Sequence, residues 1–404
     1  MFHRRLGVSC AIAAGLAIIA APQAGAAAAP AHDHSALRRD LNRLTAEGVP
    51  GALAEVRDAS GHTTVTSGVA DLGSRAAARP DSEFRIYSNT KTFVATVVLQ
   101  LVAEHRVALD APIERYLPGL IRSNGNDGRR ITGRQLLQHT SGLADYADDL
   151  PMFAPGQFFR HRFDRFTPRR LIAVALAHRP VAEPGTGFSY ATTNYIVAGL
   201  LIEKVTGRPY ASEITDRVLR PLRLRHTYFP GDQVGIRGPH PRGYTTVDDS
   251  GRLVDATEVG QTMVWAGGEM ISTADDLNRF FAALLRGDLL PPRLLAQMTR
   301  TVPAGELFPG ARYGLGLINA PLSCGGDYWA HGGDGPGFQT RDGATRDGRQ
   351  VTVMLNRSPT TPPQFDHALA AVNDAPDRLV PRPPPEGSAF GITNREFRAG
   401  PPAA

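Results

Sequence analysis

Segments that alternate between apolar and polar residues lie near both ends of this chain, whereas its middle contains short helical runs. The early segments are Ala52–Asp58 and His62–Val69, with a short turn sequence between them. The late segments, which alternate or are continuously apolar, are Tyr313–Ile318, Tyr328–His331, Gly337–Thr345 and Gln350–Asn356. Such patterns are typical of β-strands. Strands from both ends pack most economically as one antiparallel sheet, with the middle of the chain inserted as a separate lobe.

Helical patterns account for most of the remaining sequence. We expect helices at Ser35–Glu47, Ser88–Glu104, Leu171–Ala177, Tyr195–Val205 and residues 364–373. The Ser88–Glu104 segment has almost no polar face, so we expect this helix to be buried on most sides. The predicted fold class is therefore α+β: an antiparallel sheet flanked by helices, with an inserted all-helical lobe at about residues 105–264. A substrate cleft is expected between the two lobes.

The chain has 404 residues and a formal net charge of +5. It contains no block of basic residues of the kind that binds nucleic acid, so we expect no nucleic-acid partner. Its length fits one large domain, which we place at residues 35–380. The tail at 381–404 is rich in Pro and Gly, and we expect it to be disordered.

The first residues have the features of an export signal. Arg4 and Arg5 precede an apolar run, and Ala24-Gly25-Ala26 is a small-residue cleavage site. The apolar run is shorter than the ~20 residues of a membrane-spanning helix. We therefore predict a signal peptide at 1–26, a flexible new N-terminus at 27–34, and a secreted protein with no stable membrane anchor. A retained anchor is the alternative reading of residues 1–26.

Cys10 and Cys324 are the two cysteines, and the first lies in the predicted signal. Cys324 therefore has no intramolecular disulfide partner in the mature chain, and we interpret it as a buried bystander thiol.

Lysine is rare in this chain. Only Lys91 and Lys204 are lysines among the 44 basic residues, and all the others are arginines. A buried lysine can lose its proton near neutral pH, whereas a guanidinium effectively cannot. Lys204 precedes Gly207 at a predicted helix end, where a cation stabilises the helix dipole. Lys91 has no such explanation and is therefore the candidate for acid–base chemistry.

Ser88 and Lys91 lie three residues apart at the head of the buried helix. Side chains at this spacing share one helix face, so the Lys91 amine can lie beside the Ser88 hydroxyl. A neutral Lys91 could take the Ser88 proton, and an acyl-serine would follow. The free N–H groups at the helix start favour the developing oxyanion. By contrast, the structural interpretation is a helix-capping Ser and a Lys whose amine reaches solvent.

Two further segments carry candidate chemistry. Tyr190 precedes the helix at Tyr195–Val205 and could relay a proton to or from a leaving group. The glycine-rich segment after His331 would let a ligand approach the backbone closely. Taken alone, Tyr190 could equally be a packed core ring and the glycine-rich segment a simple turn.

Together these segments resemble the three motifs of the penicillin-recognising Ser-x-x-Lys serine hydrolases. This family includes extracellular D-alanyl-D-alanine carboxypeptidases, class C β-lactamases and related esterases. Matching phrases occur at residues 84–91, 136–143, 184–186, 200–207 and 313–317, and the resemblance spans about 40–375. It implies a β-lactamase/transpeptidase-like fold, with Ser88 acylated, Lys91 activating it, and Tyr190 and His331 assisting proton transfer. It also implies an oxyanion hole from the N–H groups of Ser88 and about Asp334. His139 belongs to one phrase, and we interpret it as structural.

The chain departs from the family pattern at its predicted substrate-binding residues. Thr192 stands where the second motif usually has Asn. Gly332, Gly333 and Asp334 follow His331, where the carboxypeptidase branch has Thr-Gly and a hydroxyl residue. The arginines of that branch before its Leu-Ser-Cys are replaced by Ile318-Asn319-Ala320. These changes remove groups expected to hold a substrate carboxylate, and Asp334 is expected to repel one.

We therefore expect a secreted serine hydrolase that acts through an acyl-serine on a small-molecule or peptide substrate. A divergent D-alanyl-D-alanine carboxypeptidase, or a related amidase or esterase, best fits the residues. The substrate could be a peptidoglycan stem peptide, a β-lactam or an ester. A β-lactamase is one alternative, and a non-catalytic cell-wall or ligand-binding module is another. No metal or cofactor is expected, because His331 has no Cys or His partner at ligand spacing.

Overall fold

A computed structural model provides the structure of the chain. It describes residues 35–59, 61–154, 156–246, 250–322 and 325–358. The predicted signal peptide and N-terminus, Cys324, the helix expected at 364–373 and the predicted tail all lie outside the described residues. The domain limits at 35 and 380 stay a prediction.

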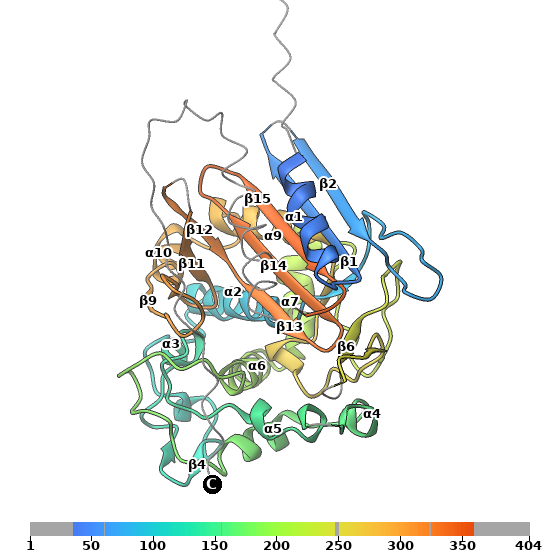
Figure 1. Cartoon of the computed structure of the whole chain (residues 1–404). Coiled ribbons are helices and arrows are strands. Elements are labelled where there is room, and N and C mark those ends of the chain that lie inside the picture. The colour runs from blue at the N-terminus through green and yellow to red at the C-terminus, as the bar shows by residue number, and fades with distance from the viewer. Residues whose placement is uncertain (1–34, 60, 155, 247–249, 323–324, 359–404) are drawn as a thin grey trace, which may run out of the picture. The chain divides into compact units, whose positions relative to one another are not determined.

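Strands from both ends of the described chain form one antiparallel sheet, in the order β2-β1-β15-β14-β12-β11-β10-β9, with β13 paired to β14 (Figure 1). Its strands are β1 (Gly51–Asp58), β2 (Gly61–Gly68), β9 (Val302–Pro303), β10 (Arg312–Tyr313), β11 (Ile318–Pro321), β12 (Asp327–Ala330), β13 (Gly332–Gly335), β14 (Phe338–Ala344) and β15 (Gln350–Leu355). The early strand β1 pairs with the late strand β15, from Ala52 opposite Leu355 to Arg57 opposite Gln350. This arrangement confirms the predicted α+β fold class.

Helices cover both faces of the sheet (Figure 1). Alternate side chains of a strand point to opposite faces. Ala52 and Ala54 of β1 pack in one apolar cluster with Leu41 of α1 (Ser35–Ala46). Leu53, between them, belongs instead to the larger cluster that includes Phe280 of α9 (Ala274–Arg286). Alternate residues of β1 therefore pack into two different apolar clusters, and the strand is buried on both faces.

The remaining helices are α2 (Thr90–Ala103), α3 (Gly133–Leu137), α4 (Phe158–His161), α5 (Pro168–Ala175), α6 (Thr193–Thr206), α7 (Tyr210–Ile214), α8 (Arg220–Leu222) and α10 (Pro292–Met298). The predicted helices at Leu171–Ala177 and Tyr195–Val205 correspond to α5 and α6. Gly207 ends α6 in the left-handed conformation with φ of +73°, as the sequence around Lys204 predicted.

Short hairpins also lie within residues 105–264, where only helices were expected. They are formed by β4 (Arg122–Ser123) with β5 (Asn126–Asp127), and by β6 (Tyr244–Thr246) with β7 (Leu253–Asp255). Strands of two or three residues are too short to show a period in the sequence. A further short pair joins β3 (Phe84–Arg85) to β8 (Ile271–Ser272).

The single strand predicted at Tyr313–Ile318 is wrong. The chain reverses there, between β10 and β11. A Cβ on Gly314 would lie 2.1 Å from the carbonyl oxygen of Met298, and Gly316 has a φ of +77°. Both glycines therefore permit a tight turn against the core. The apolar residues in this turn are buried, which made its sequence resemble a strand.

Helix α2 lies at the centre of the larger apolar cluster. Its residues from Thr90 to Leu99 are all buried, which confirms the predicted burial of this segment. The ring of Phe93 stacks on Phe280 of α9, with centroids 3.6 Å apart and planes 11° apart. Because α9 packs against the sheet, this contact ties α2 to the sheet. In the described part of the chain, no helix is long and apolar enough to cross a membrane.

We predict that Phe93→Ala lowers the free energy of unfolding by about 3–5 kcal/mol, because it leaves a cavity beside Phe280. Urea denaturation of the purified protein measures this change. Phe153→Ala, at a ring that is 48% exposed, serves as the control and should change stability by less than about 1 kcal/mol. Equal losses in the two variants would contradict the central position of α2.

Candidate active site

Ser88 lies where β3 leads through a 3₁₀ turn (Tyr87–Asn89) into α2. Its neighbours Tyr87 and Asn89 are buried, but Ser88 is partly exposed. Its backbone N–H is in the first turn of the helical segment, where N–H groups have no acceptor within the helix. Tyr87 has a φ of +41°, which is unusual for a non-glycine residue. The Ser88 side chain and N–H are therefore presented together from a constrained turn.

The Lys91 amine makes two hydrogen bonds. Nζ lies 2.9 Å from Oγ of Ser88 and donates to the carbonyl oxygen of Gly267 at 2.8 Å. The side chain is fully buried. Burial lowers the pKa of Lys91 to about 7, and the nearby Asp145 carboxylate opposes this shift. A substantial fraction of Lys91 is therefore neutral near pH 7, with a lone pair able to accept a proton from Ser88.

Tyr190 lies just before α6 and is half-buried. The centroid of its ring is 5.1 Å from Lys91 Nζ. Burial raises the pKa of Tyr190, while a hydrogen bond to Ser88 acts in the opposite direction. The phenol is therefore protonated at neutral pH and can donate a proton. Its backbone N–H donates to Oε1 of Glu306 at 2.7 Å, which fixes the residue from the other side.

His139 packs directly on Tyr190. The two rings stack with centroids 4.2 Å apart and planes 26° apart. Nδ1 of His139 accepts a hydrogen bond from the Ala191 N–H and lies 3.1 Å from Nδ2 of Asn194. Burial lowers the pKa of His139 well below its usual value, so the ring is neutral. These contacts agree with a structural role, in which His139 holds the Tyr190 ring in place.

His331 is buried, and both of its ring nitrogens are hydrogen-bonded. Nδ1 donates to the carbonyl oxygen of Gly332 at 2.7 Å, so Nε2 accepts from the Tyr313 hydroxyl at 2.9 Å. Burial, assisted by the charge of Lys91, lowers the pKa of His331 to about 3. With neither nitrogen free, direct proton transfer by His331 does not fit this geometry. Its contacts instead suit a residue that positions Tyr313 and the start of β13.

Thr192, at the place of the usual Asn, is partly buried. It packs against Gly267, whose carbonyl oxygen accepts the hydrogen bond from Lys91. A Cβ built on Gly267 would lie 2.4 Å from Cγ2 of Thr192. The Thr192 N–H donates to Oδ2 of Asp145 at 2.8 Å, and Oδ1 of Asp145 accepts from the Ala147 N–H at 3.1 Å. The carboxylate of Asp145 is thus held close enough to Lys91 and Tyr190 to influence both pKa values.

The glycine-rich strand β13 packs on the segment that carries Ser88. A Cβ on Gly333 would lie 2.0 Å from the carbonyl oxygen of Ile86, and one on Gly335 would lie 2.3 Å from the Tyr87 ring. The Tyr87 hydroxyl also donates to the Pro336 carbonyl oxygen at 2.7 Å. Only glycine therefore permits this approach at positions 333 and 335.

The register of the β13–β14 hairpin orients the Asp334 backbone. Gly335 pairs with Phe338 across a two-residue turn, and Asp334 pairs with Gln339. Hydrogen-bonded and non-hydrogen-bonded pairs alternate in antiparallel strands. The pair that closes the turn, Gly335 with Phe338, is a hydrogen-bonded pair, so the next pair, Asp334 with Gln339, is not. The Asp334 N–H therefore points away from β14, along the free edge of β13.

The Asp334 side chain is not an isolated negative charge. Arg341 donates to it with both terminal nitrogens, each at 2.9 Å, and Nε2 of Gln339 donates at 2.6 Å. The predicted repulsion of a substrate carboxylate by Asp334 is therefore corrected, because Arg341 neutralises this charge. In the same way, Arg341 is already occupied and is not a free cation for that carboxylate.

The sequence did not point to Asp145, Gly267, Glu306, Tyr313 or Arg341. Asp145, Gly267, Glu306 and Tyr313 each lie at least 18 residues from the group they contact. Arg341 lies seven residues from Asp334, but on the neighbouring strand, so their contact depends on the pairing of β13 with β14. Among the described residues, no group of three or more His, Cys, Asp or Glu side chains is placed to hold a metal ion.

The sequence and the fold of this chain are similar to those of known proteins. The profile of the Beta-lactamase family matches residues 31–375. The solved D-stereospecific amidohydrolase from Streptomyces sp. is 42% identical, with a TM-score of 0.76 over 80% of this chain and 94% of that one. The D-amino acid amidase from Ochrobactrum anthropi SV3, solved with L-phenylalanine amide, is 26% identical, with a TM-score of 0.71 over 86% of this chain and 96% of that one. Protein flp of Staphylococcus aureus is 32% identical over 162 residues, which cover 40% of this chain and 31% of flp.

We predict that kcat/KM falls below an apparent pKa of about 7, by about tenfold per pH unit, because Lys91 must be neutral to take a proton. Asp145→Asn should move this acidic limb to lower pH, since the lost carboxylate favours the charged amine. A pH–rate profile measures both effects. Asp148→Asn, an exposed change on the same 3₁₀ turn, should leave the limb in place. A shift to higher pH in Asp145→Asn would refute the role of its charge.

We further predict that Gly333→Ala lowers kcat/KM by about 100-fold, because the added methyl group must push β13 away from Ile86. Steady-state kinetics and circular dichroism together separate this effect from unfolding. Gly235→Ala, where a Cβ meets nothing within 4 Å, is the matched control and should retain full activity. A fully active Gly333→Ala would exclude a tight contact between β13 and the Ser88 segment.

Proposed function

Because this chain belongs to the Beta-lactamase family of penicillin-recognising serine hydrolases, we propose that it is a secreted amidohydrolase that forms an acyl intermediate on Ser88. One observation carries the proposal: the fully buried Lys91 amine lies 2.9 Å from the Ser88 hydroxyl. A lysine in this environment can act as a general base at neutral pH, and the partly exposed Ser88 is accessible to a substrate.

In the proposed first step, Ser88 Oγ attacks the carbonyl carbon of an amide while its proton passes to the Lys91 amine. The oxyanion would accept hydrogen bonds from the N–H groups of Ser88 and Asp334. The C–N bond then breaks, and the leaving nitrogen receives a proton from Tyr190, which is reprotonated from Lys91. The products of this step are a free amine and an acyl ester on Ser88.

In the second step, a water molecule attacks the ester carbonyl and loses a proton to the same Lys91–Tyr190 pair. The Ser88–acyl bond breaks, a carboxylic acid leaves, and Ser88 recovers its proton. His139 and His331 would act as positioning residues, because His139 supports the Tyr190 ring and His331 bonds to Tyr313. Gly332 and Gly333 would line the oxyanion side of the site, and Thr192 the side of Lys91.

For the substrate class, we propose amides of D-amino acids. The named activities of the Streptomyces and Ochrobactrum proteins support this choice, and the alignments cover most of each chain. The site also fits a substrate without a terminal carboxylate, because Arg341 is committed to Asp334. The C-terminal amide of such a substrate is neutral, so its binding does not require a free cation in the site.

A divergent D-alanyl-D-alanine carboxypeptidase is the second candidate, favoured by the family phrases around Ser88 and His139. For this activity, a substrate carboxylate would have to compete with Asp334 for Arg341. A β-lactamase would need rapid hydrolysis of the acyl-serine, and a non-catalytic binding module would not need Ser88. Export stays part of the proposal and rests on residues 1–26, which precede the described residues.

We predict that the wild-type protein hydrolyses D-phenylalanine amide faster than the L isomer. It should also gain the mass of one acyl group when incubated with a β-lactam or an activated ester. Ser88→Ala should lose both properties, with at least about a 1,000-fold lower rate of hydrolysis, since nucleophilic catalysis is removed. Chiral chromatography and intact-mass spectrometry provide the measurements, with Ser74→Ala as the serine control.

Other outcomes separate the alternatives. Many turnovers of nitrocefin per molecule would indicate a β-lactamase, and release of D-alanine from a D-alanyl-D-alanine peptide would indicate a carboxypeptidase. Ligand binding that is unchanged in Ser88→Ala, without turnover of any amide, ester or β-lactam, would replace the proposal with a binding module.

A further inference from the structure

A polar hollow lies outside the Ser88 site. It has a volume of about 650 Å³, within the usual range for ligand pockets. It is formed by α7, the π-helical turn at Thr215–Leu219, α8 and residues 223–229. Its charged lining consists of four arginines and one acid, namely Arg208, Arg220, Arg223, Arg225 and Asp216. This lining therefore has an excess of three positive charges.

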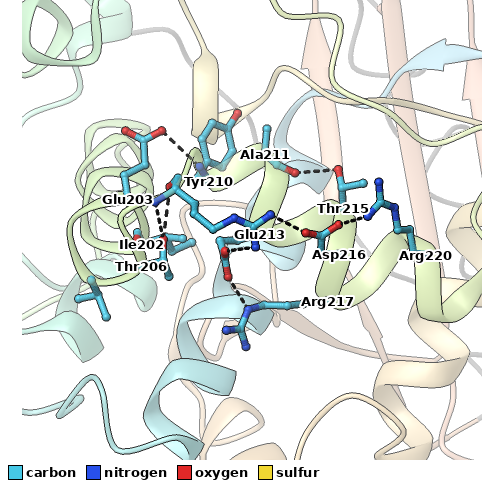
Figure 2. A network of polar contacts seen from close by, with 12 residues as sticks. Ile202, Glu203, Thr206, Tyr210, Ala211, Glu213, Thr215, Asp216, Arg217 and Arg220 are labelled. Carbon is cyan, nitrogen blue, oxygen red and sulfur yellow. Dashed lines mark hydrogen bonds and ion pairs between the residues drawn. The ribbon is translucent and has the colours of Figure 1, made fainter.

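Two of these arginines are held in place by one shared carboxylate. Arg208 and Arg220 each donate to a different oxygen of Asp216, both at 2.5 Å. Figure 2 shows Arg220 beside Asp216. Arg208 also lies 2.8 Å from Glu213, which in turn pairs with Arg217. Asp216 and Glu213, with Glu104 on the far side of Arg217, balance the charges of Arg208, Arg220 and Arg217. These contacts therefore orient Arg208 and Arg220 in advance, and the net positive charge of the hollow comes from Arg223 and Arg225.

The other two arginines have no acidic partner within the described part of the chain. Arg223 and Arg225 are both exposed, and no described carboxylate lies within ion-pair distance of either side chain. Arg223 also has a φ of +53°, a left-handed conformation in which glycine is preferred at a helix end. Its carbonyl oxygen accepts from Nη1 of Arg279 at 3.3 Å, which holds this conformation.

The backbone beneath the hollow is irregular as well. The five residues Thr215–Leu219 form a π-helical turn, and Thr215, Asp216 and Leu219 of this turn line the hollow. π-helical turns are rare and occur frequently at functional sites. An irregular turn, an arginine in a strained conformation and unpaired cations therefore coincide in one place.

The hollow is distinct from the catalytic centre. Arg217 of the π-helical turn pairs with Glu104, which caps the C-terminal end of α2, whereas Ser88 precedes its N-terminal end. A helix of 14 residues is about 21 Å long. Changes in the hollow are therefore not expected to alter the Ser88 chemistry directly.

We propose that this arginine hollow binds a ligand that carries two or more adjacent phosphate groups. Guanidinium forks match phosphate oxygens and form strong charge-assisted hydrogen bonds with them. A ligand with a single negative charge would leave one of the two unpaired guanidinium groups uncompensated, whereas a multiply charged phosphate ligand balances both and can also accept from Arg208 and Arg220. The hollow also has room for more than a single ion.

Tripolyphosphate is the probe that tests this proposal, measured by isothermal titration calorimetry on the full chain. Binding should be detectable at low salt and weaken as sodium chloride is raised, because the contacts are ionic. Arg223→Ala/Arg225→Ala should reduce the affinity by about tenfold or more. Arg223→Lys/Arg225→Lys, which keeps the charge and loses the fork, should show a smaller loss. Inorganic phosphate should bind more weakly than tripolyphosphate.

The matched control is Arg293→Ala/Arg300→Ala, which removes the same charge from two exposed positions on or next to α10. It should bind tripolyphosphate like the wild type. An equal loss in both alanine pairs would overturn the proposal, because attraction would then follow net charge alone. Absence of tripolyphosphate binding at millimolar concentration would also overturn it, as would tighter binding of citrate. Circular dichroism and Ser88-dependent hydrolysis should be unchanged in every variant, so a folding defect is recognised.

Discussion

The burial of one amine is the interaction on which the rest of this structure depends. The shift in the pKa of Lys91 from its ordinary value of 10.5 to about 7 corresponds to about 5 kcal/mol in favour of the neutral form. That preference exists only because α2 is enclosed on all sides. The carbonyl oxygen of Gly267 and the Ser88 hydroxyl satisfy the hydrogen bonds of the buried amine. The packing that buries α2 therefore also lowers the pKa of Lys91.

Close approach of backbone segments completes the site. Ser88 precedes α2, Gly267 ends the 3₁₀ turn (Trp265–Gly267) before β8, and Gly333 lies in β13, so three distant parts of the chain converge. They can do so because glycines remove the side chains that would collide, as the position of Gly333 against Ile86 illustrates. The aromatic and histidine rings around Tyr190 then fill the remaining space. These rings are buried and neutral, so they shape the site without adding charge.

Charge near the site is balanced by specific pairs. Asp145 is fixed by two backbone N–H groups and opposes the neutralisation of Lys91. Asp334 and Arg341 neutralise each other at the edge of β13. The departure from the family motif at Asp334 is therefore accompanied by a compensating contact. Such a site favours a neutral leaving group, in agreement with the proposed amidase activity.

Much of this protein could be predicted from the sequence. The alternating segments at both ends predicted one antiparallel sheet, because strand periodicity is local. The rarity of lysine, with Ser88 three residues before Lys91, predicted their contact, because residues on one helical turn are neighbours in any fold. Short hairpins and the turn within 313–318 were not predictable, since they are too short to have a period or are buried like strands. Only the tertiary structure decided that Asp145 influences Lys91, that Arg341 neutralises Asp334 and that His331 bonds to Tyr313. The physical reason is that packing, and not spacing along the chain, determines these contacts. Asp145 and Lys91 are far apart in the sequence, and Arg341 reaches Asp334 only because β14 pairs with β13.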